Sequence, residues 1–443
     1  PVQPRAMGFL VSPDEAKSLG MDHDERFRQR IRPYRNGRDI TDKPRGVFII
    51  DLFGLSAEEA RSAVPSLYQW VHDRVKPERD HNKRDTYRLN WWIFGEPVPA
   101  TRRSVAGLSR YVSTTMTAKH RVFVFLDADI LPDQKLITVG VQDPLHLGVL
   151  SSRVHSCWAL ATGGNLGVGN DPVYAKGRSF DPFPFPDPAP TQAARIRDLA
   201  EQLDAHRKRQ QSLHPELTLT GMYNVLEKLR AGDTLTPKER AIHEQGLVSV
   251  LRELHDALDS AVFEAYGWSD LAAQLVGKPG ATTPLPDKPE AQVAAEEELL
   301  RRLVELNAAR AAEEARGLVR WLRPDYQNPG AAAALAASQS QAPSQLEAER
   351  GGGAAGTAGA EEGEGAEGEA PAAPVAAGKL AWPRSMREQV AAVRSALAHQ
   401  PLTAEAIAAR FKRAPRAAVL AVLEALEELG MVVGEEGAYR LQG

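Results

Sequence analysis

One long segment of low complexity, residues 327–378, limits how this chain of 443 residues can fold. From Asn328 to Gly378 it consists almost entirely of Ala, Gly, Glu, Pro, Ser and Gln, including the run GGGAAGTAGAEEGEGAEGEAPAAP. Such a segment cannot bury enough apolar side chain to offset the entropy lost when a chain becomes ordered. We therefore predict a disordered acidic linker with folded parts on either side of it.

The composition excludes several classes of protein. A net charge of -4 argues against a uniformly basic nucleic-acid binder, although the linker carries much of the negative charge. The single cysteine, Cys157, excludes a disulfide framework and a zinc ribbon and fits a reducing compartment. No apolar run approaches the roughly 18 residues of a membrane span. We expect a cytoplasmic protein without a membrane partner, and because the chain starts at Pro1 rather than Met, we expect the native N-terminus to lie upstream.

After a lead-in (residues 1–30), residues 31–188 mix strand and helix patterns and predict an α/β domain. Short apolar runs bounded by Gly, Pro or Asp predict strands at Gly46–Phe53, Asn90–Phe94, Arg110–Thr115, Arg121–Leu126 and Lys135–Val141. Ser56 is a candidate N-cap for a helix that runs to Val75 and that Pro65 must kink or divide. Leu145–Leu160 has a helical period. The irregular connections exclude a doubly wound fold.

A dense basic segment precedes the first of these strands. Between Arg26 and Arg45 there are eight Lys or Arg residues and only two carboxylates, and Pro and Gly residues bound the segment. These breakers predict a loop that the following strand anchors. Arg35, Asn36 and Arg38 are residue types that read base edges or bind phosphates. The alternative is a solvated basic surface loop.

Two further basic stretches lie in the same domain. VKPERDHNKRDTYRLNWW interleaves bases with aromatics, which suits phosphate contact and stacking on bases. Alternatively, Trp91 and Trp92 straddle a strand, with at least one of them in the core. From Pro97 to Leu126 there are five Lys or Arg and no acid. The candidate DNA contacts are Arg35, Asn36, Arg38, Arg79, Lys83, Arg84, Tyr87, Arg88, Arg102, Arg103 and Lys119.

The segment Gly163–Tyr174, GGNLGVGNDPVY, imitates catalytic elements. Its glycines suggest a nucleotide loop, and DPVY is one residue from the Asp/Asn-Pro-Pro-aromatic motif with which amino-methyltransferases hold a target amine. A cofactor loop needs a preceding strand and a following helix. These glycines follow a predicted helix and run directly into DPVY, which favours a surface turn. The Pro-rich run Ser179–Pro188 predicts an extended domain edge.

Residues 189–326 predict a helical domain. Charged amphipathic helices are expected at Thr191–Gln211, Thr220–Arg230, Pro237–Tyr266 and Glu290–Leu322, the third with Thr236 as N-cap and Pro237 at its first position. His206, His214, His243 and His255 fall here without a partner at ligand spacing, so we predict no metal site.

After the linker, residues 379–443 predict a winged helix. Helices are expected at Ser385–Leu397, Thr403–Phe411 and Pro415–Leu429, followed by the strand, turn and strand of Met431–Leu441. Lys412, Arg413 and Arg416 lie at the start of the third helix, where DNA contact is expected. Glutamates lie at the other end of that helix, and many winged helices bind only proteins. Both DNA binding and protein binding therefore stay open for this domain.

Many short blocks of the sequence resemble blocks of one protein family and occur in the same order. They are GRDITDKPRGVFIIDLFGL, VKPERD, YRLNWWIFGEP, AKHRVF, LGVLSSRVH, GGNLGVGNDPVY, SFDPFPFP, LDAHRKRQ, LTLTGMYNVLEKLRAG and HEQGLVSVLRELHDALD. The chain resembles the C-terminal part, the target recognition domain and helical region, of MmeI-like, type IIL restriction-modification, adenine-specific DNA methyltransferases. The resemblance covers about Ile31 to Asp270.

The resemblance implies double-stranded DNA as the partner and adenine methylation as the activity of the whole enzyme. In the family, the loop that binds S-adenosylmethionine and the catalytic motif lie upstream of the recognition domain. No catalytic or cofactor-binding residue is therefore assigned here, and we expect this chain alone to be inactive, with upstream methyltransferase or nuclease domains as possible partners. By residue type, Arg35, Asn36, Arg38, Arg84 and Arg88 are assigned to base edges, and Lys83, Arg102, Arg103 and Lys119 to phosphates.

Two alternatives stay open at this point. One is a non-enzymatic DNA-binding protein, either a stand-alone specificity subunit or a winged-helix regulator. The other is an adaptor held together through its helices, which would show no salt-dependent affinity for DNA.

Overall fold

The computed structural model describes residues 7–166, 171–330, 380–382, 386–397 and 401–412, together with short pieces between 419 and 441. The chain divides into two compact units, Pro1–Ser344 and Gln345–Gly443. The described part is mixed α/β, mostly helical, with several small sheets. Beyond Gly330, the predicted linker lies outside the described residues.

A four-stranded sheet organises the first part of unit 1. Its strands, in hydrogen-bonded order, are β1 (Leu10–Val11), β3 (Phe48–Ile50), β2 (Ile31–Arg35) and β6 (Leu131–Pro132). The pairs β1/β3 and β3/β2 are antiparallel, and β2/β6 is parallel. The surrounding helices are η1 (Met7–Phe9), α1 (Pro13–Ser18), α2 (Glu25–Arg28), α3 (Gly37–Thr41), α4 (Ala57–Ala63), α5 (Pro65–Asp80), α6 (Asp85–Leu89) and α7 (Pro99–Val105).

Local sequence rules account for the break between α4 and α5. Ser56 caps α4 in a capping box with Glu59, as predicted. Pro65 is the first residue of α5, a position where its missing N–H costs no hydrogen bond. The predicted division at this proline is confirmed.

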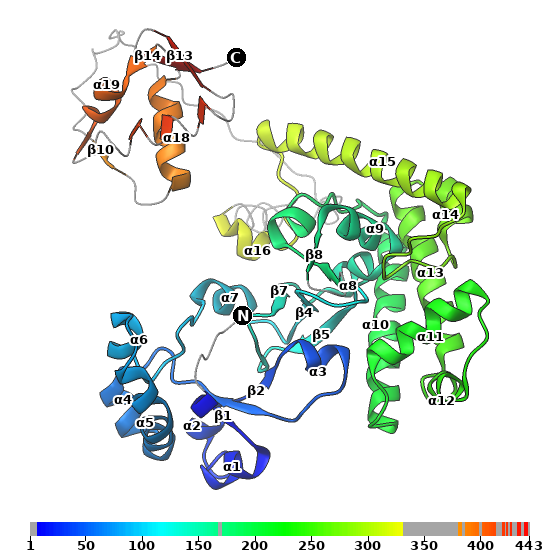
Figure 1. Ribbon diagram of the computed structural model, residues 1–443, viewed down its shortest axis with the longest axis horizontal. Coiled ribbons are helices and arrows are strands. Elements are labelled where there is room, and N and C mark those ends of the chain that lie inside the picture. The colour runs from blue at the N-terminus through cyan, green and yellow to red at the C-terminus, as the bar shows by residue number, and fades with distance from the viewer. Residues whose placement is uncertain are drawn as a thin grey trace, which may run out of the picture. The chain divides into compact units, whose positions relative to one another are not determined.

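A second, antiparallel sheet lies at the centre of unit 1, in the order β5 (Phe123–Asp127), β4 (Arg110–Thr115) and β7 (Leu136–Val139). Both of its faces are buried, because the alternating residues of β4 and β5 belong to two different hydrophobic clusters. Tyr111 and Val124 lie in the cluster that includes Ile40 of α3, and Val112 and Phe123 lie in the other. Figure 1 shows α3 on one side of this sheet and α8 and α9 on the other.

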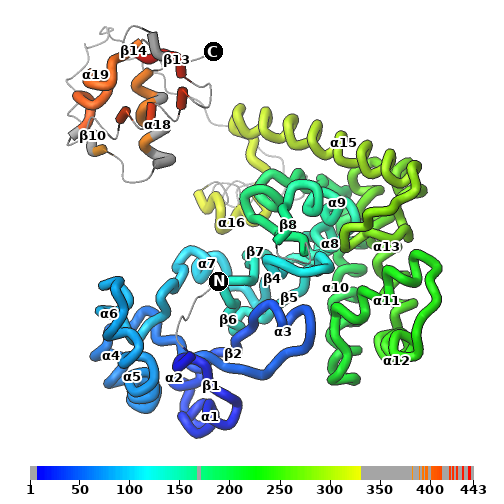
Figure 2. Tube along the Cα trace, in the orientation of Figure 1, coloured from blue at the N-terminus to red at the C-terminus, as the bar shows by residue number. Residues whose placement is uncertain are grey.

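Helices form the rest of unit 1, with one short hairpin of β8 (Gly164–Leu166) and β9 (Asp171–Val173). They are α8 (Pro144–Ser151), α9 (Arg153–Thr162), the π-helix η2 (Lys176–Phe180), α10 (Pro190–Leu213), α11 (Leu219–Ala231), α12 (Pro237–Gln245), α13 (Val248–Tyr266), α14 (Ser269–Leu275), α15 (Glu290–Ala315) and α16 (Pro324–Gln327). Figure 2 shows the central sheet between the N-terminal helices α1, α2 and α4–α6 and the helices α10–α13. One hydrophobic cluster extends from the sheet into these helices, across the boundary predicted at residue 188.

Several predicted elements differ from the structure. Asn90–Phe94 forms turns rather than a strand, because Trp91 is buried against aromatic neighbours and Trp92 donates its indole N–H to a backbone carbonyl. The helix predicted for Pro237–Tyr266 is divided between α12 and α13 at Gly246 and Leu247, where Leu247 adopts a left-handed conformation (φ 42°). The Phe/Pro run is not only a domain edge, since Phe183 is 5% exposed and packs in the core.

The second unit contains the short elements β10 (Leu380–Ala381), α18 (Met386–Leu397), β11 (Leu402–Thr403), α19 (Ala404–Ala408), β12 (Phe411–Lys412), β13 (Val432–Glu435) and β14 (Ala438–Leu441). Thr403 caps α19, and β13 pairs antiparallel with β14, as predicted. Most of Pro415–Leu429, with Arg413 and Arg416, lies outside the described residues, as does the side chain of Lys412. The winged helix and its DNA contacts stay predictions.

Candidate nucleic-acid interface

The basic segment Arg26–Arg45 is ordered structure and not the predicted loop. It forms α2, strand β2 and helix α3, and β2 lies inside the N-terminal sheet. The sequence pattern missed the strand because Pro33 was taken as a breaker, although it occupies a paired position opposite Phe48. The consequence is that Arg35, at the end of β2, is held by a sheet.

Asn36 and Asp39 fix the start of α3. Asn36 is the N-cap: its Oδ1 accepts from the backbone N–H of Arg38 at 3.0 Å and of Asp39 at 3.3 Å. Asp39 completes a capping box by accepting from the N–H of Asn36 at 2.7 Å. The side-chain oxygen of Asn36 therefore already has a structural role, and its side-chain amide N–H groups are what it can offer to a base edge.

Arg45 holds Asp39 from the other side. Its guanidinium Nε and Nη2 lie 2.9 and 2.8 Å from the two carboxylate oxygens, and its backbone N–H also donates to Asp39. Burial raises the pKa of Asp39, but the hydrogen bonds from Arg45 and Asn36 outweigh burial, so that its pKa lies below the ordinary value. Asp39 is thus a buried anion that rigidly orients the turn before α3.

Arg38 projects from this rigid turn into solvent. It is exposed, and within the described part of the chain its guanidinium forms no ion pair. Arg35 is half-buried, and its Nη1 donates to the carbonyl of Tyr34 at 3.3 Å. Both side chains keep donors for an external partner.

Lys119 lies near α3 because both pack on the start of α11. Thr220 of α11 donates to the carbonyl of Thr41 at 3.0 Å, and the exposed Lys119 donates to Asn224 of α11 at 2.5 Å. We call the surface formed by Arg35, Asn36, Arg38 and Lys119 the α3 face.

A buried arginine supports the loop that carries Lys119. Arg121 is 3% exposed and donates to the hydroxyl of Thr114 and to the carbonyls of Thr115 and Pro172. Its guanidinium lies 5.1 Å from the ring centroid of Tyr174. Burial lowers the pKa of Arg121 to about 10, so the group stays charged at neutral pH. The loop before β5 is thereby tied to β9.

Tyr174, the aromatic residue of the DPVY segment, has a structural role. It is 1% exposed, and its hydroxyl lies 3.1 Å from His155 Nε2. Burial lowers the pKa of His155 to about 3, so the ring is neutral. Its Nε2 accepts a hydrogen bond from the Tyr174 hydroxyl, and its Nδ1–H donates to the carbonyl of Leu150. The described ends of the glycine segment pair as β8 and β9, without the helix that a cofactor loop needs. Residues 167–170 lie outside the described residues. The described part of this segment is a β-hairpin and not the loop before a helix that would bind S-adenosylmethionine.

The second basic stretch, Lys76–Trp92, is here called the α5–α6 region. Arg79 is 1% exposed and lies 4.9 Å above the ring of Tyr87, so it cannot reach DNA without local unfolding. The burial of Arg79 corrects its assignment as a DNA contact. Arg79 is buried because of its helical spacing: it follows Leu67, Val71 and Val75 on the buried side of α5.

Local acids neutralise other cations of this region. Lys76 pairs with Asp80 at 2.6 Å and Arg88 with Asp85 at 2.5 Å. Tyr87 is 4% exposed, which removes it as a stacking surface for a base. Lys83 and Arg84 are exposed, although the Arg84 guanidinium lies 5.7 Å from the ring of Tyr87. Trp91 is buried and Trp92 half-buried, which confirms that at least one of the pair lies in the core, although they lie in a turn and not in the expected strand.

The two arginines of α7 have different environments. Arg103 is exposed, as a phosphate contact requires. Arg102 binds both carboxylate oxygens of the buried Asp51, at 2.6 and 3.1 Å, and its Nε donates to Pro97. Arg102 is therefore first a structural link between α7 and the end of β3. No local sequence pattern predicts this pair, because 51 residues separate the partners.

Two histidines of the helical region, His255 and His206, contact polar groups inside the protein. His255 is buried and lies 2.8 Å from the hydroxyl of Tyr223. His206 Nε2 lies 3.1 Å from the carbonyl of Gly246. In the described ranges, no group of three or more His, Cys, Asp or Glu side chains is placed to hold a metal ion. No helix described here is long and apolar enough to cross a membrane.

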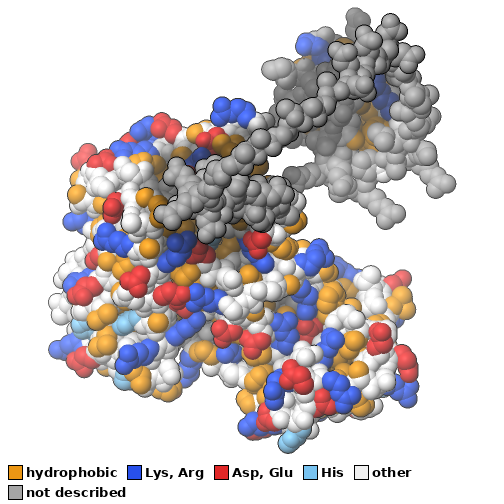
Figure 3. Space-filling model, turned by 180° about the vertical axis from the view of Figure 1, so that it is seen from behind, with side chains coloured by type: hydrophobic (Ala, Val, Ile, Leu, Met, Phe, Trp, Pro, Cys, Tyr) orange, Lys and Arg blue, Asp and Glu red, His pale blue; other side chains and the backbone are white. Residues whose placement is uncertain are grey.

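One face of unit 1 carries surface charge of both signs. On the face shown in Figure 3, Lys and Arg side chains are interspersed with Asp and Glu, without one extended basic field. Any DNA contact on such a surface depends on individual well-placed cations.

No protein-family model and no curated protein matches the chain. Among solved structures, the chain is similar to the type IIL restriction-modification enzyme MmeI in complex with DNA, with 18% sequence identity and a TM-score of 0.47. The match covers 69% of this chain and 35% of that one, so this chain spans about a third of the length of the protein it matches.

Proposed function

We propose that this chain recognises double-stranded DNA as the specificity-determining part of a site-specific adenine methyltransferase. The proposal rests on the ordered sequence blocks that resemble MmeI-like enzymes, and in the structure on one observation about the α3 face. There, residue types that read bases project from a turn that is fixed by internal hydrogen bonds. A side chain that is already oriented loses less conformational entropy on binding.

In this proposal, Arg35, Asn36 and Arg38 contact base edges, and Lys119 contacts a phosphate. Arg103, Lys83 and Arg84 supply further backbone contacts, and Arg84 or Arg88 can read a base only if it leaves its present partner. Arg79, Tyr87 and Arg102 act indirectly, by holding the elements that carry the others.

Methyl transfer is assigned to a catalytic core outside this chain, which would bind S-adenosylmethionine. The residues described here offer no Gly-rich loop between a strand and a helix for that cofactor. We therefore derive no chemical step from this chain, and the role of its own residues is to bind and orient the duplex.

The proposal is tested by selecting duplexes from a random pool with the purified chain and measuring affinity by fluorescence anisotropy at several salt concentrations. We expect enrichment of one short sequence, and we expect the logarithm of the affinity to fall linearly with the logarithm of the salt concentration. With S-adenosylmethionine added, the chain should bind without methylating. The absence of salt-dependent binding would exclude DNA recognition and favour the adaptor alternative, whereas methylation by the chain alone would refute the assignment of catalysis to an upstream core.

A further inference from the structure

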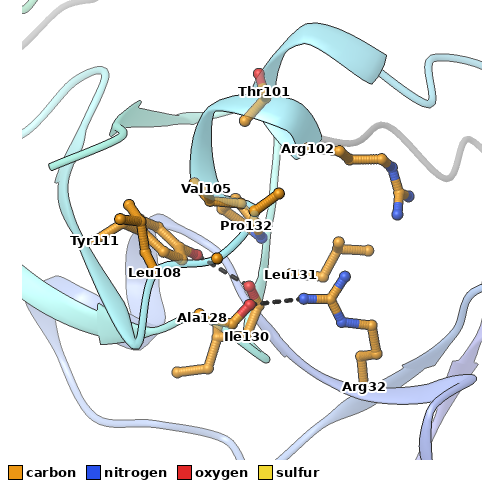
Figure 4. A pocket seen from close by; sticks show the side chains of 12 residues that line it. Arg32, Thr101, Arg102, Val105, Leu108, Tyr111, Ala128, Ile130, Leu131 and Pro132 are labelled. Atoms are coloured by element: carbon orange, nitrogen blue, oxygen red, sulfur yellow. Dashed lines mark hydrogen bonds between the residues drawn. The ribbon is translucent and has the colours of Figure 1, made fainter. Parts of the chain in front are cut away.

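A cavity of about 240 Å³ lies beside α7 and is not explained by the contacts assigned above. Figure 4 shows it between α7, the turn that follows it, the start of β4 and the loop leading into β6. Val105, Leu108, Tyr111, Leu131 and Pro132 form apolar walls. The hydroxyl of Tyr111 already donates to the carbonyl of Ile130 at 3.0 Å, so the cavity receives little polar character from this residue.

Two guanidinium groups, those of Arg32 and Arg102, lie on one side of this cavity (Figure 4). Arg32 is fixed by hydrogen bonds from Nε to the carbonyl of Asp129 and from Nη2 to that of Ala128, both at 2.8 Å. Its remaining nitrogen, Nη1, lies 3.8 Å from Asp51 and forms no hydrogen bond among the described residues. Strand β2 and the loop before β6 thus hold the Nη1 donor of Arg32 in a fixed position.

The charge on this side of the cavity is not balanced. Arg32 and Arg102 share one buried carboxylate, that of Asp51, whose side chain is 6% exposed. Asp129 is exposed and acts on Arg32 more weakly than Asp51 does. Burial lowers the pKa of Arg32, which means that its charge lacks full compensation. An added anion would provide that compensation.

The combination of walls and charge restricts the ligand. A bare anion would make no use of the apolar walls, and an uncharged apolar molecule would leave the excess charge unpaired. A nucleotide provides both a flat base and an anionic phosphate. The surroundings favour this class, because α7 also carries the exposed Arg103 and β2 also carries Arg35.

We propose that this cavity binds a nucleotide, with its base against Val105, Leu108 and Leu131 and its phosphate on Arg32 and Arg102. The nucleotide has two possible sources: a free mononucleotide, or a nucleotide extruded from bound DNA. The second source rests on the proposed function, and the first does not.

The first experiment titrates the whole chain with dAMP, dTMP and inorganic phosphate by calorimetry. We expect the nucleotides to bind at least about tenfold more tightly than phosphate, since only a nucleotide also buries the apolar surface of its base against the apolar side chains of the cavity. Leu108→Trp, which fills the cavity, should weaken nucleotide binding by about tenfold or more. Leu213→Trp is the matched control, because Leu213 is 59% exposed on α10, and it should leave binding unchanged.

If Leu108→Trp lowers the melting temperature strongly, Val105→Phe replaces it as the cavity-filling variant. Equal affinities for nucleotides and phosphate would overturn the proposal. So would unchanged nucleotide binding in a folded cavity-filling variant.

The second experiment identifies the source. In duplexes selected by the chain, 2-aminopurine replaces each base in turn, and its fluorescence rises where a base is extruded. Extrusion into the cavity predicts a rise that Leu108→Trp removes while overall duplex affinity changes by less than about threefold. A bound duplex without this rise leaves the free nucleotide as the source if the calorimetry is positive, and overturns the cavity proposal if it is negative. If no duplex binds, the proposed function fails, and calorimetry alone decides the cavity.

Discussion

The α3 face and the α5–α6 region are both rich in Lys and Arg, yet they present their charges differently. In helix α3, which carries part of the α3 face, the buried acid Asp39 is paired with Arg45, and Arg38 stays exposed. In the α5–α6 region, Arg79 is buried, and exposed acids pair with Lys76 and Arg88. A basic stretch of sequence therefore does not by itself provide the capacity to bind an anion. What matters is whether a cation has an internal partner.

The largest expected effect tests the structural role of Arg79. Arg79→Ala should reduce the free energy of unfolding by about 2 to 4 kcal/mol, because it removes a long side chain packed on Tyr87 and Phe9. Arg84→Ala, at an exposed position, should change it by less than about 0.5 kcal/mol. Chemical denaturation measures both. An unchanged stability of Arg79→Ala together with weakened DNA binding would refute the contrast between the two regions.

The next effect concerns Asp39 and its dependence on pH. Asp39→Asn should cost about 2 kcal/mol at pH 7, since the capping box and the pair with Arg45 lose their anion. The folded pKa of Asp39 is lowered, so its stabilisation is fully present above the unfolded pKa of about 4 and is lost as pH falls through the lower folded pKa. Denaturation of both proteins between pH 7 and pH 3 should show the difference shrinking only below about pH 4. A constant difference at all pH values would contradict this origin.

Base reading by the α3 face predicts a smaller, sequence-specific effect. Arg38→Ala should cost about 1 to 3 kcal/mol against the selected sequence and little against other duplexes. Arg88→Ala should cost less, because Arg88 must first leave Asp85. Competition binding with selected and scrambled duplexes measures both losses. Equal losses on every sequence would mean that these arginines contact phosphates and not bases.

The smallest effect separates the phosphate contacts. Lys119→Ala and Arg103→Ala should each weaken binding to all sequences alike and lower the slope of log affinity against log salt by about one. Arg102→Ala should act mainly on stability, since it leaves Asp51 without its bidentate partner. Melting temperatures and salt titrations of the three variants provide the comparison. A slope unchanged by Lys119→Ala would remove this residue from the interface.

Some of the fold could be predicted because its causes are local. Ser56, Pro65, Thr236 and Pro237 each mark a helix start, and the structure places all four as expected. The central strands were predicted within a few residues because each is a short apolar run between breakers. The strand β2 was missed, because its pairing with β3 compensates for Pro33, and the division between α12 and α13 was missed because a glycine was its only signal.

For the candidate site, too, some features were determined by the sequence and others only by the tertiary structure. The sequence by itself determined which residue types could contact DNA and where the folded parts are separated by a low-complexity stretch, since composition and spacing act over a few residues. Only the tertiary structure decided that Arg79 is buried, that Arg102 binds Asp51, and that Arg32, absent from the predicted contacts, lines a cavity. The physical reason is that the exposure and pairing of a charge depend on groups far away in the chain, which local patterns do not contain.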